Sequence, residues 1–310
     1  MIKIIEDPEA ERNLIESSVK KYGSTPDHNF DWFLYCVEGA KPRVFYREDG
    51  SCILAFYSPD SNEWALFSDP IAPPNAHGEI IKETVDFIFN QNNVSKISFL
   101  DVREPILKFI EFSSLGDCEV DYELVWPVLN MDKFDPDLPG GHFKTIRNAK
   151  NKFYREHKVE IVEARFVDKN LLYGLVDRWN KNRIKADIQE LFPNRYRRII
   201  DGGFRGMASA RAMMIDGALV GFNAGWETPN TPGDYSAAVG IHDFSAKDLG
   251  LALLIEDLEW IKKAGYRTCD LEGSEPEALK FKMQFLPERT YKTYTFYLVK
   301  HSMFDRHNKN

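Results

Sequence analysis

The chain has 310 residues, of which 43 % are hydrophobic and 28 % are charged, so it can bury a large core and its length predicts two domains or one long one. Its formal net charge of −8 argues against a protein that coats nucleic acid. No apolar run approaches the roughly 18 residues of a membrane span, and the start MIKIIEDPEAERN has no apolar signal region. We therefore expect a cytoplasmic protein without a transmembrane segment.

The cysteines and histidines form no metal-binding pattern. Cys36, Cys52, Cys118 and Cys269 lie far apart in the chain, without a C-x-x-C pair, and the seven histidines show no H-E-x-x-H spacing. We predict no metal site, and we expect the four cysteines to be reduced core residues because free cysteine is normally buried.

The N-terminal half predicts a helix, a hairpin, a strand, a second helix and a second strand, in that order. The hairpin is indicated by two strand-like runs that flank Asp49-Gly50, a dipeptide that favours tight turns. The loop before the second helix contains three prolines, which remove amide donors, so we expect no phosphate site there. The segments are PEAERNLIESSVKKYG (8–23), RVFYREDGSCILAFYS (43–58), NEWALFSD (62–69), HGEIIKETVDFIFNQN (77–92) and KISFLDV (96–102).

The C-terminal half repeats this order of elements. Its hairpin is indicated by Asp216-Gly217, and its segments are DKNLLYGLVDRWNKNRIK (168–185), RAMMIDGALVGFNAGW (211–226), DYSAAVGI (234–241), KDLGLALLIEDLEWIKKAG (247–265) and YRTCDLEG (266–273). The repeat predicts a mixed α/β architecture used twice, antiparallel at each hairpin and parallel around each crossover helix. We predict an N-terminal domain over 1–135, a connecting helix over 136–160 and a C-terminal domain over 161–310.

Charge is unevenly distributed along the chain. Ten acidic and three basic residues lie between 101 and 143, whereas 144–158 holds six Lys or Arg against one Glu, and 178–198 holds seven against two acidic residues. Two local basic patches on an acidic protein fit a partner with localised phosphate. The alternative is that both patches are solvated helix faces.

The segment LKFKMQFLP (279–287) predicts a short helix with a lysine on its apolar side. Ser274 and Glu277 have the spacing of a capping box, and Pro287 should end the helix. The core-facing positions of such a helix are Ala278, Phe281, Lys282 and Phe285. The Lys282 ammonium either reaches water along its methylene stem or serves a cavity that needs a cation.

The element order resembles the GNAT acyltransferase fold. GNAT proteins follow their central strand with a Q/R-x-x-G-x-G/A loop at a helix N-terminus, which holds the pyrophosphate of coenzyme A. Here the strand YSAAVGI leads into KDLGLA (247–252), with Lys247 in the Gln or Arg position. Gly250 could instead allow close helix packing.

A more specific resemblance is to the catalytic domain of the phosphatidylglycerol lysyltransferases, a tandem GNAT fold. FKMQFLP (281–287) resembles its F-K-x-K-F-x-P segment, FSDPIAPP (67–74) its G-D-P-V-G-P turn, and HFKTIRNAKNKFYREH (142–157) its basic helix. The chain departs from the first motif at Gln284, and we expect no counterpart of the membrane-spanning portion of those enzymes. In such enzymes the substrates meet in a tunnel between the two GNAT halves, which the helix carrying Lys282 would line.

The resemblance implies a transferase that moves an aminoacyl or acyl unit onto an amine or hydroxyl. We predict Lys282 as oxyanion stabiliser, and Glu272 or Asp270 as the group that acts as base or positions the amine. The predicted donor-binding residues are Arg147, Lys150, Lys247, Gly250 and Ala252, and the predicted substrate-binding residues are Lys280, Asn223 and Tyr235.

Three functions remain open from the sequence. The donor is an aminoacyl-tRNA, whose acceptor end would dock on a basic stripe, or coenzyme A carrying an acyl group. The acceptor is a small molecule or a lipid headgroup. A GNAT fold that has lost catalysis and only binds a nucleotide or protein is the third interpretation. The sequence leaves the oligomeric state open.

Overall fold

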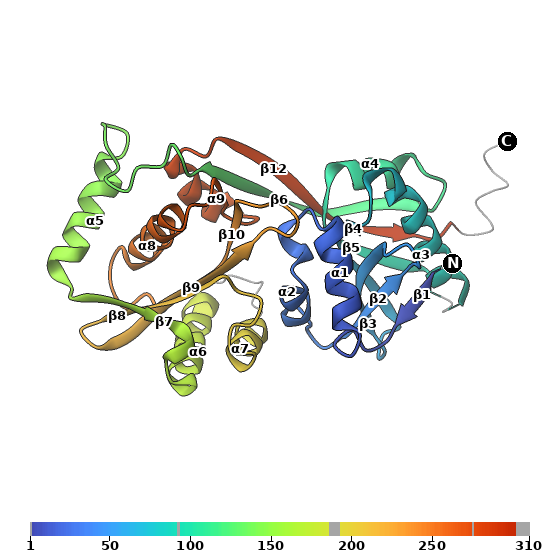
Figure 1. The fold of residues 1–310 in the computed structure, drawn as a ribbon, viewed down its shortest axis with the longest axis horizontal. Coiled ribbons are helices and arrows are strands. Elements are labelled where there is room, and N and C mark those ends of the chain that lie inside the picture. The colour runs from blue at the N-terminus through green and yellow to red at the C-terminus, as the bar shows by residue number, and fades with distance from the viewer. Residues whose placement is uncertain (1, 92–93, 186–192, 275, 302–310) are drawn as a thin grey trace. The chain divides into compact units, whose positions relative to one another are not determined.

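A computed structural model describes residues 2–91, 94–185, 193–274 and 276–301. The chain divides into two compact units (Figure 1). Unit 1 comprises Met1–Val125, Pro229–Thr231 and Tyr291–Asn310, and unit 2 comprises Trp126–Thr228 and Pro232–Thr290. Strands β6 (Asp117–Asn130) and β12 (Arg289–Val299) each contribute residues to both units. The predicted boundaries at 135 and 161 stay a prediction.

Unit 1 is a mixed sheet with helices packed on it. The strand order is β1-β2-β3-β4-β5-β12-β6, in which β4 and β5 are parallel. The strands other than β6 and β12 are β1 (Lys3–Ile5), β2 (Lys41–Tyr46), β3 (Cys52–Ser58), β4 (Glu63–Ile71) and β5 (Lys96–Arg103). The helices are α1 (Arg12–Tyr22), α2 (Phe30–Tyr35), α3 (His77–Gln91) and α4 (Glu104–Phe112), with 3₁₀ turns at Pro26–His28 and Pro74–Ala76.

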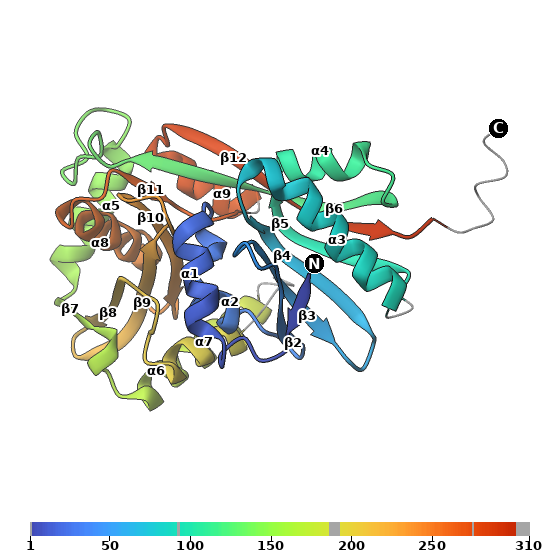
Figure 2. The ribbon, with the colours of Figure 1, turned by 45° about the vertical axis from the view of Figure 1, so that its right-hand side comes forward.

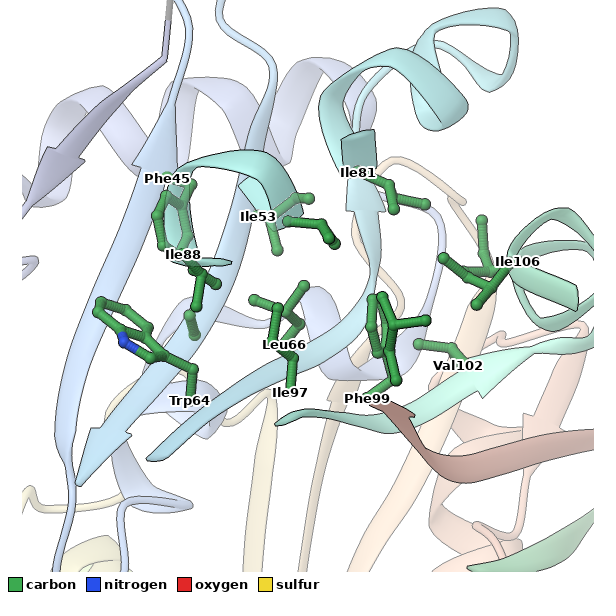
Figure 3. Packing of buried hydrophobic residues seen from close by; sticks show 14 of the residues in the cluster. Phe45, Ile53, Trp64, Leu66, Ile81, Ile88, Ile97, Phe99, Val102 and Ile106 are labelled. Carbon is green, nitrogen blue, oxygen red and sulfur yellow. The ribbon is translucent and has the colours of Figure 1, made fainter. Parts of the chain in front are cut away.

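One hydrophobic core of unit 1 lies between the sheet and helices α3 and α4. Figure 2 shows α3 beside the parallel strands β4 and β5, and this helix connects the two strands in the chain. Ile81 and Ile88 from α3 and Ile106 from α4 meet strand side chains such as Leu66 and Phe99 (Figure 3). These residues are at most 3 % exposed, so the helix faces are fixed by burial of apolar surface.

Unit 2 repeats the arrangement. Its strand order is β6-β11-β10-β9-β8-β7, in which β10 and β11 are parallel. The strands are β7 (Val159–Glu163), β8 (Ser209–Ile215), β9 (Ala218–Glu227), β10 (Asp234–His242) and β11 (Thr268–Asp270). The helices are α5 (Lys144–Glu156), α6 (Lys169–Lys185), α7 (Pro193–Asp201), α8 (Leu249–Lys263) and α9 (Pro276–Lys282), with 3₁₀ turns at Ala164–Phe166 and Met283–Phe285. Helix α8 packs on β9 and β10.

Both predicted hairpins are confirmed. Strands β2 and β3 pair antiparallel around Asp49-Gly50, and β8 and β9 around Asp216-Gly217. Asp216 and Gly217 have φ angles of +51° and +83°, which is the left-handed geometry of a two-residue type I′ turn. The order helix, hairpin, strand, helix, strand therefore occurs twice, as α1, β2-β3, β4, α3, β5 and as α6, β8-β9, β10, α8, β11.

Some local predictions need correction or fall outside the described residues. Ala278 is exposed rather than on a buried stripe, because α9 ends at Lys282 and the chain continues as a 3₁₀ turn. Cys118 is half-buried, whereas the other three cysteines are buried as predicted, and all four are free. Residues 186–192 of the second basic patch and the predicted helix end at 92 lie outside the described residues. No described helix is both long and apolar enough to cross a bilayer.

Candidate active site in unit 2

The candidate site lies where the parallel strands β10 and β11 separate. Pairing between them is limited to three residues and ends at Ser236 and Asp270. Strand β10 then continues to His242, with an irregularity between Ser236 and Val239, and leads into the loop before α8. The carboxyl ends of neighbouring parallel strands are the usual place for ligands in α/β sheets.

The chain after β11 forms a tight polar turn. Asp270, 8 % exposed, accepts a hydrogen bond at its Oδ1 from the Glu272 amide, at 2.9 Å. Glu272 has a φ of +66°, which is uncommon for a residue with a side chain. The Ser274 hydroxyl donates to the Glu272 carbonyl oxygen at 3.1 Å. The turn is thus held in a strained conformation by side chains on both sides, and such strain concentrates at functional sites.

Lys282 anchors this turn. Its Nζ donates hydrogen bonds to the carbonyl oxygens of Leu271 and Glu272, the second at 3.3 Å. The ammonium is therefore directed at the backbone of the strand end rather than out along the helix into bulk water. Because an ammonium has three donors, these two contacts leave one for another acceptor.

Electrostatics at Lys282 act in opposite directions. Burial lowers the pKa of its ammonium, while the carboxylates of Glu272 and Asp270 raise it. The net effect is a lowered pKa, so the charged ammonium is less stable in the folded protein than it is in water. A half-buried ammonium at a strand end can stabilise negative charge that develops on a neighbouring oxygen.

The N-terminus of α8 follows β10. Asp248, at the cap position, has a φ of +64° and makes no capping hydrogen bond with its side chain. Gly250 packs against His242, since a Cβ placed at Gly250 would lie 2.7 Å from His242 Nε2. The glycine therefore has a packing role, whether or not its amide binds a ligand. Lys247 is exposed in the preceding loop, whereas Ala252 is buried and its amide already donates to the Asp248 carbonyl at 3.0 Å.

Comparison with known proteins identifies the family. The sequence profile of the family described as "Phosphatidylglycerol lysyltransferase, C-terminal" matches residues 21–272. The chain belongs to this family. No protein with a curated description matches the sequence.

Solved structures with low identity share the fold of this lysyltransferase-family chain. L-PGS from Bacillus licheniformis is 17 % identical, with 97 % of this chain and 95 % of that chain covered and a TM-score of 0.68. The C-terminal domain of a putative lysylphosphatidylglycerol synthetase from Agrobacterium fabrum is 15 % identical, with 97 % and 94 % covered and a TM-score of 0.67. A tandem GNAT protein from the clavulanic acid biosynthesis pathway is 10 % identical, with 97 % and 99 % covered and a TM-score of 0.58. The chain is thus a tandem GNAT-fold protein, and family and fold point to transferase activity of the acyltransferase type.

Two predicted donor-binding cations hold a loop. Arg147 Nη1 donates to the carbonyl oxygens of Leu138 and Gly140, the second at 3.1 Å. Lys150 Nζ donates to the Pro136 carbonyl at 3.0 Å and pairs with Glu259 at 2.5 Å. These contacts use one terminal nitrogen of Arg147 and two of the three donors of Lys150, so each cation keeps donors beyond those that hold the loop.

The predicted substrate-binding residues are scattered in unit 2. Asn223 is 5 % exposed and donates from Nδ2 to the Leu253 carbonyl in α8 at 2.7 Å. Tyr235 is fully buried against Trp260 and Tyr266, and burial raises its pKa above the ordinary value. Lys280 is exposed on α9. The structure brings together Lys282, Glu272 and Asp270, and it does not place these three residues with them.

Sequence reasoning missed both hydrogen-bond partners of Lys282 and the local role of Ser274. The carbonyl oxygens of Leu271 and Glu272 have no sequence signal, because every residue carries a carbonyl. The Ser274 hydroxyl was predicted to cap a helix, but it donates to the Glu272 carbonyl, and α9 begins at Pro276. The spacing of the serine two residues after Glu272 is the signal that could have indicated this local turn.

Proposed function

We propose that the chain transfers an aminoacyl or acyl group from an ester or thioester donor to an amine or hydroxyl acceptor. The observation that carries the proposal is the Lys282 ammonium, held by two carbonyl oxygens at the end of β11 with one donor left over. This position lies where β10 and β11 separate, so an acyl carbonyl entering there would meet a fixed cation.

The proposed chemistry is addition of the acceptor to the donor carbonyl. The lone pair of the acceptor nitrogen or oxygen forms the new bond, and the carbonyl electrons move onto the oxygen, which becomes negative. The third donor of Lys282 stabilises that oxygen. Glu272 accepts the acceptor's proton, directly or through water. When the tetrahedral intermediate collapses, the bond from the carbonyl carbon to the donor oxygen or sulfur breaks and Glu272 returns the proton to that atom, so the donor departs as a hydroxyl or thiol. Asp270 acts as a positioning residue, because its carboxylate fixes the Glu272 amide.

For the donor, we propose that a phosphate lies at the start of α8. Lys247 is exposed there, and the amides of Gly250 and Leu251 belong to the first turn, where helix amides lack intrahelical acceptors. Both an aminoacyl-tRNA and an acyl-CoA carry suitable phosphates. The family name favours aminoacyl transfer to phosphatidylglycerol, so we place that donor and acceptor first.

The experiment measures transfer with both donors. The purified chain is incubated with lysyl-tRNA or acetyl-CoA and with phosphatidylglycerol micelles or a panel of primary amines, and the acylated product is detected by mass spectrometry. Lys282→Met should reduce the rate at least about 100-fold, the size of effect seen when one oxyanion donor is removed. Lys282→Arg keeps the positive charge and should retain more activity than Lys282→Met.

Lys263→Met is the matched control, since Lys263 is exposed in the last turn of α8 and touches none of the site residues in the described chain. Full activity of Lys282→Met would remove Lys282 from the mechanism. Transfer from acetyl-CoA alone would establish the second candidate function, an acyl-CoA-dependent acyltransferase. Binding of either donor without turnover, with every acceptor, would favour the non-catalytic interpretation.

A further inference from the structure

A pocket of about 470 Å³ lies in unit 2, apart from the Lys282 turn. We call it the Leu286 pocket. Its walls are the end of β6, the loop after β6 and the segment after α9. The lining residues are Leu129, Asn130, Lys133, Phe134, Asp135, Leu138, Pro139, Phe143, Phe285, Leu286 and Glu288. This volume and a mostly apolar lining with a few polar groups are typical of small-molecule sites.

The backbone of this pocket is strained at two leucines. Among the described residues, the leucines with a left-handed backbone are Leu138 (φ +50°) and Leu286 (φ +56°), and both line the pocket. A positive φ is uncommon for a bulky side chain, and residues in such conformations are enriched at ligand clamps and active sites. Leu286 is also 56 % exposed, so its apolar side chain is held at the surface beside the pocket.

Hydrogen bonds from residues outside the lining hold the walls of the pocket in place. The loop wall is fixed by three cations that donate to its carbonyl oxygens: Arg147 to Leu138 and Gly140, Lys150 to Pro136, and Lys262 to Met131. His142 Nε2 lies 3.2 Å from the Gln284 carbonyl and links the loop wall to the other wall. The strained leucines are therefore held in place by contacts outside the pocket.

The charges of the pocket favour a cation. Its lining contains one cation, Lys133, and two carboxylates, Asp135 and Glu288. Lys133 Nζ contacts Glu288 Oε1 at 2.6 Å, and Asn130 Nδ2 donates to the same oxygen at 3.0 Å. Both contacts use Oε1, so Oε2 of Glu288 is the carboxylate oxygen left to a ligand.

The aromatic lining points to the same charge. Phe134, Phe143 and Phe285 line the pocket, and aromatic side chains can attract an ammonium group. We propose that the Leu286 pocket binds an organic ammonium ion, with its apolar body against the phenylalanines and leucines and its ammonium at Glu288. The proposal is independent of the transfer reaction, because binding needs neither donor nor Lys282.

The test compares three probes of one shape. Calorimetric titration of the full chain at pH 7 uses 2-phenylethylammonium, 2-phenylethanol and 3-phenylpropionate at one ionic strength. We expect the ammonium to bind at least about tenfold more tightly than the alcohol, and the carboxylate to bind most weakly. Hexylammonium carries an alkyl chain in place of the phenyl ring, so its affinity shows whether the pocket prefers an alkyl or an aryl ammonium ion.

Variants assign the binding to the pocket. Glu288→Gln should weaken the ammonium about tenfold and leave the alcohol unchanged. Leu286→Gly should weaken all three probes without unfolding the chain, because glycine accepts a positive φ. Glu277→Gln, an exposed glutamate in the first turn of α9, is the matched control and should change nothing.

Three results would overturn the proposal: equal affinity for the alcohol and the ammonium, unchanged ammonium affinity in Glu288→Gln, or no binding of any probe. Lys282→Met should retain wild-type probe affinity. Failure of probe binding therefore leaves the proposed transfer reaction standing, and failure of transfer leaves the pocket standing.

Discussion

Lowering the pH from 7 to 5 should weaken unit 1 through one buried histidine. His28 is fully buried in the 3₁₀ turn before α2. The Ser24 amide donates to its Nδ1 at 2.9 Å, so Nδ1 carries no proton and Nε2–H donates to the Asp69 carbonyl, also at 2.9 Å. Both ring nitrogens are thus used by the neutral form. Burial lowers the pKa of His28 from 6.5 to about 4.

The sign and size of the effect follow from this pKa. Between pH 6.5 and 4 the unfolded chain binds a proton at His28 that the folded chain does not, so the free energy of unfolding falls as the pH falls. The contribution is complete above pH 6.5. It decreases by about 2 kcal/mol at pH 5 and by about 3 kcal/mol below pH 4.

The assay is hydrogen exchange of unit 1 peptides combined with urea unfolding at pH 7, 6 and 5. His28→Gln keeps a donor toward the Asp69 carbonyl but cannot take up a proton, so it should show a smaller loss between pH 7 and 5 than the wild type, by about 2 kcal/mol. Ser24→Ala is the control. It removes a hydroxyl that accepts from Arg103 and keeps the amide bond to His28, so it should lower stability equally at each pH.

An equal pH dependence in wild type and His28→Gln would refute this reasoning. It would mean that His28 is protonated in the folded chain, and hence that the neutral form assigned from its two contacts is wrong. A larger pH dependence in Ser24→Ala than in the wild type would likewise show that lower stability, rather than loss of the titrating group, governs the slope.

Two further predictions concern unit 2. Asp257 in α8 is 2 % exposed, and burial raises its pKa from 3.8 to about 7. Between these two pH values the folded chain holds a proton that the unfolded chain lacks. The free energy of unfolding therefore falls as the pH rises from 3.8 to 7. Asp257→Asn should remove this fall and be more stable than the wild type at pH 8, as measured by urea unfolding; a less stable variant at pH 8 would contradict it. Gly225→Ala should destabilise unit 2 by at least about 2 kcal/mol, because its Cβ would lie 2.2 Å from the Ser236 carbonyl oxygen, whereas Gly141→Ala meets nothing within 4 Å and should melt like the wild type.

The repeated fold was predictable because its signals are local. Asp49-Gly50 and Asp216-Gly217 specify tight turns through their own backbone preferences, whatever surrounds them. Apolar residues that alternate predicted the neighbouring strands, and apolar residues with helical spacing predicted the helices. The repeated order of these elements indicated the second unit. Even so, Ala278 was wrongly placed on a buried stripe. Its helix is only seven residues long, and so short an element is poorly defined by periodicity.

The candidate site was only partly predictable, because its contacts join residues to backbone atoms. The pattern marked Lys282 as an unusual lysine, but nothing in the sequence marked the carbonyl oxygens of Leu271 and Glu272 as its acceptors. Likewise, nothing in the sequence marked the loop carbonyl oxygens that Arg147 and Lys150 contact, and their role as phosphate ligands stays a prediction. A charge that the fold buries needs a partner, and the fold decides which partner it is.

The Lys282 ammonium holds the turn after β11 and is proposed to take part in transfer. Measuring the stability of one variant cannot separate these two roles. Removing the ammonium relieves the desolvation cost of a buried charge, but it also takes the hydrogen bond from the Leu271 carbonyl, whereas the Glu272 carbonyl keeps the Ser274 hydroxyl. Methionine fills a similar volume without that desolvation cost, so this effect by itself would leave stability unchanged or raised. Loss of the bond to the Leu271 carbonyl adds an opposing contribution of about 1 kcal/mol. Activity must therefore be compared at equal folded fraction, because loss of transfer from a fully folded Lys282→Met protein is the result that assigns the ammonium to the chemistry rather than to the turn.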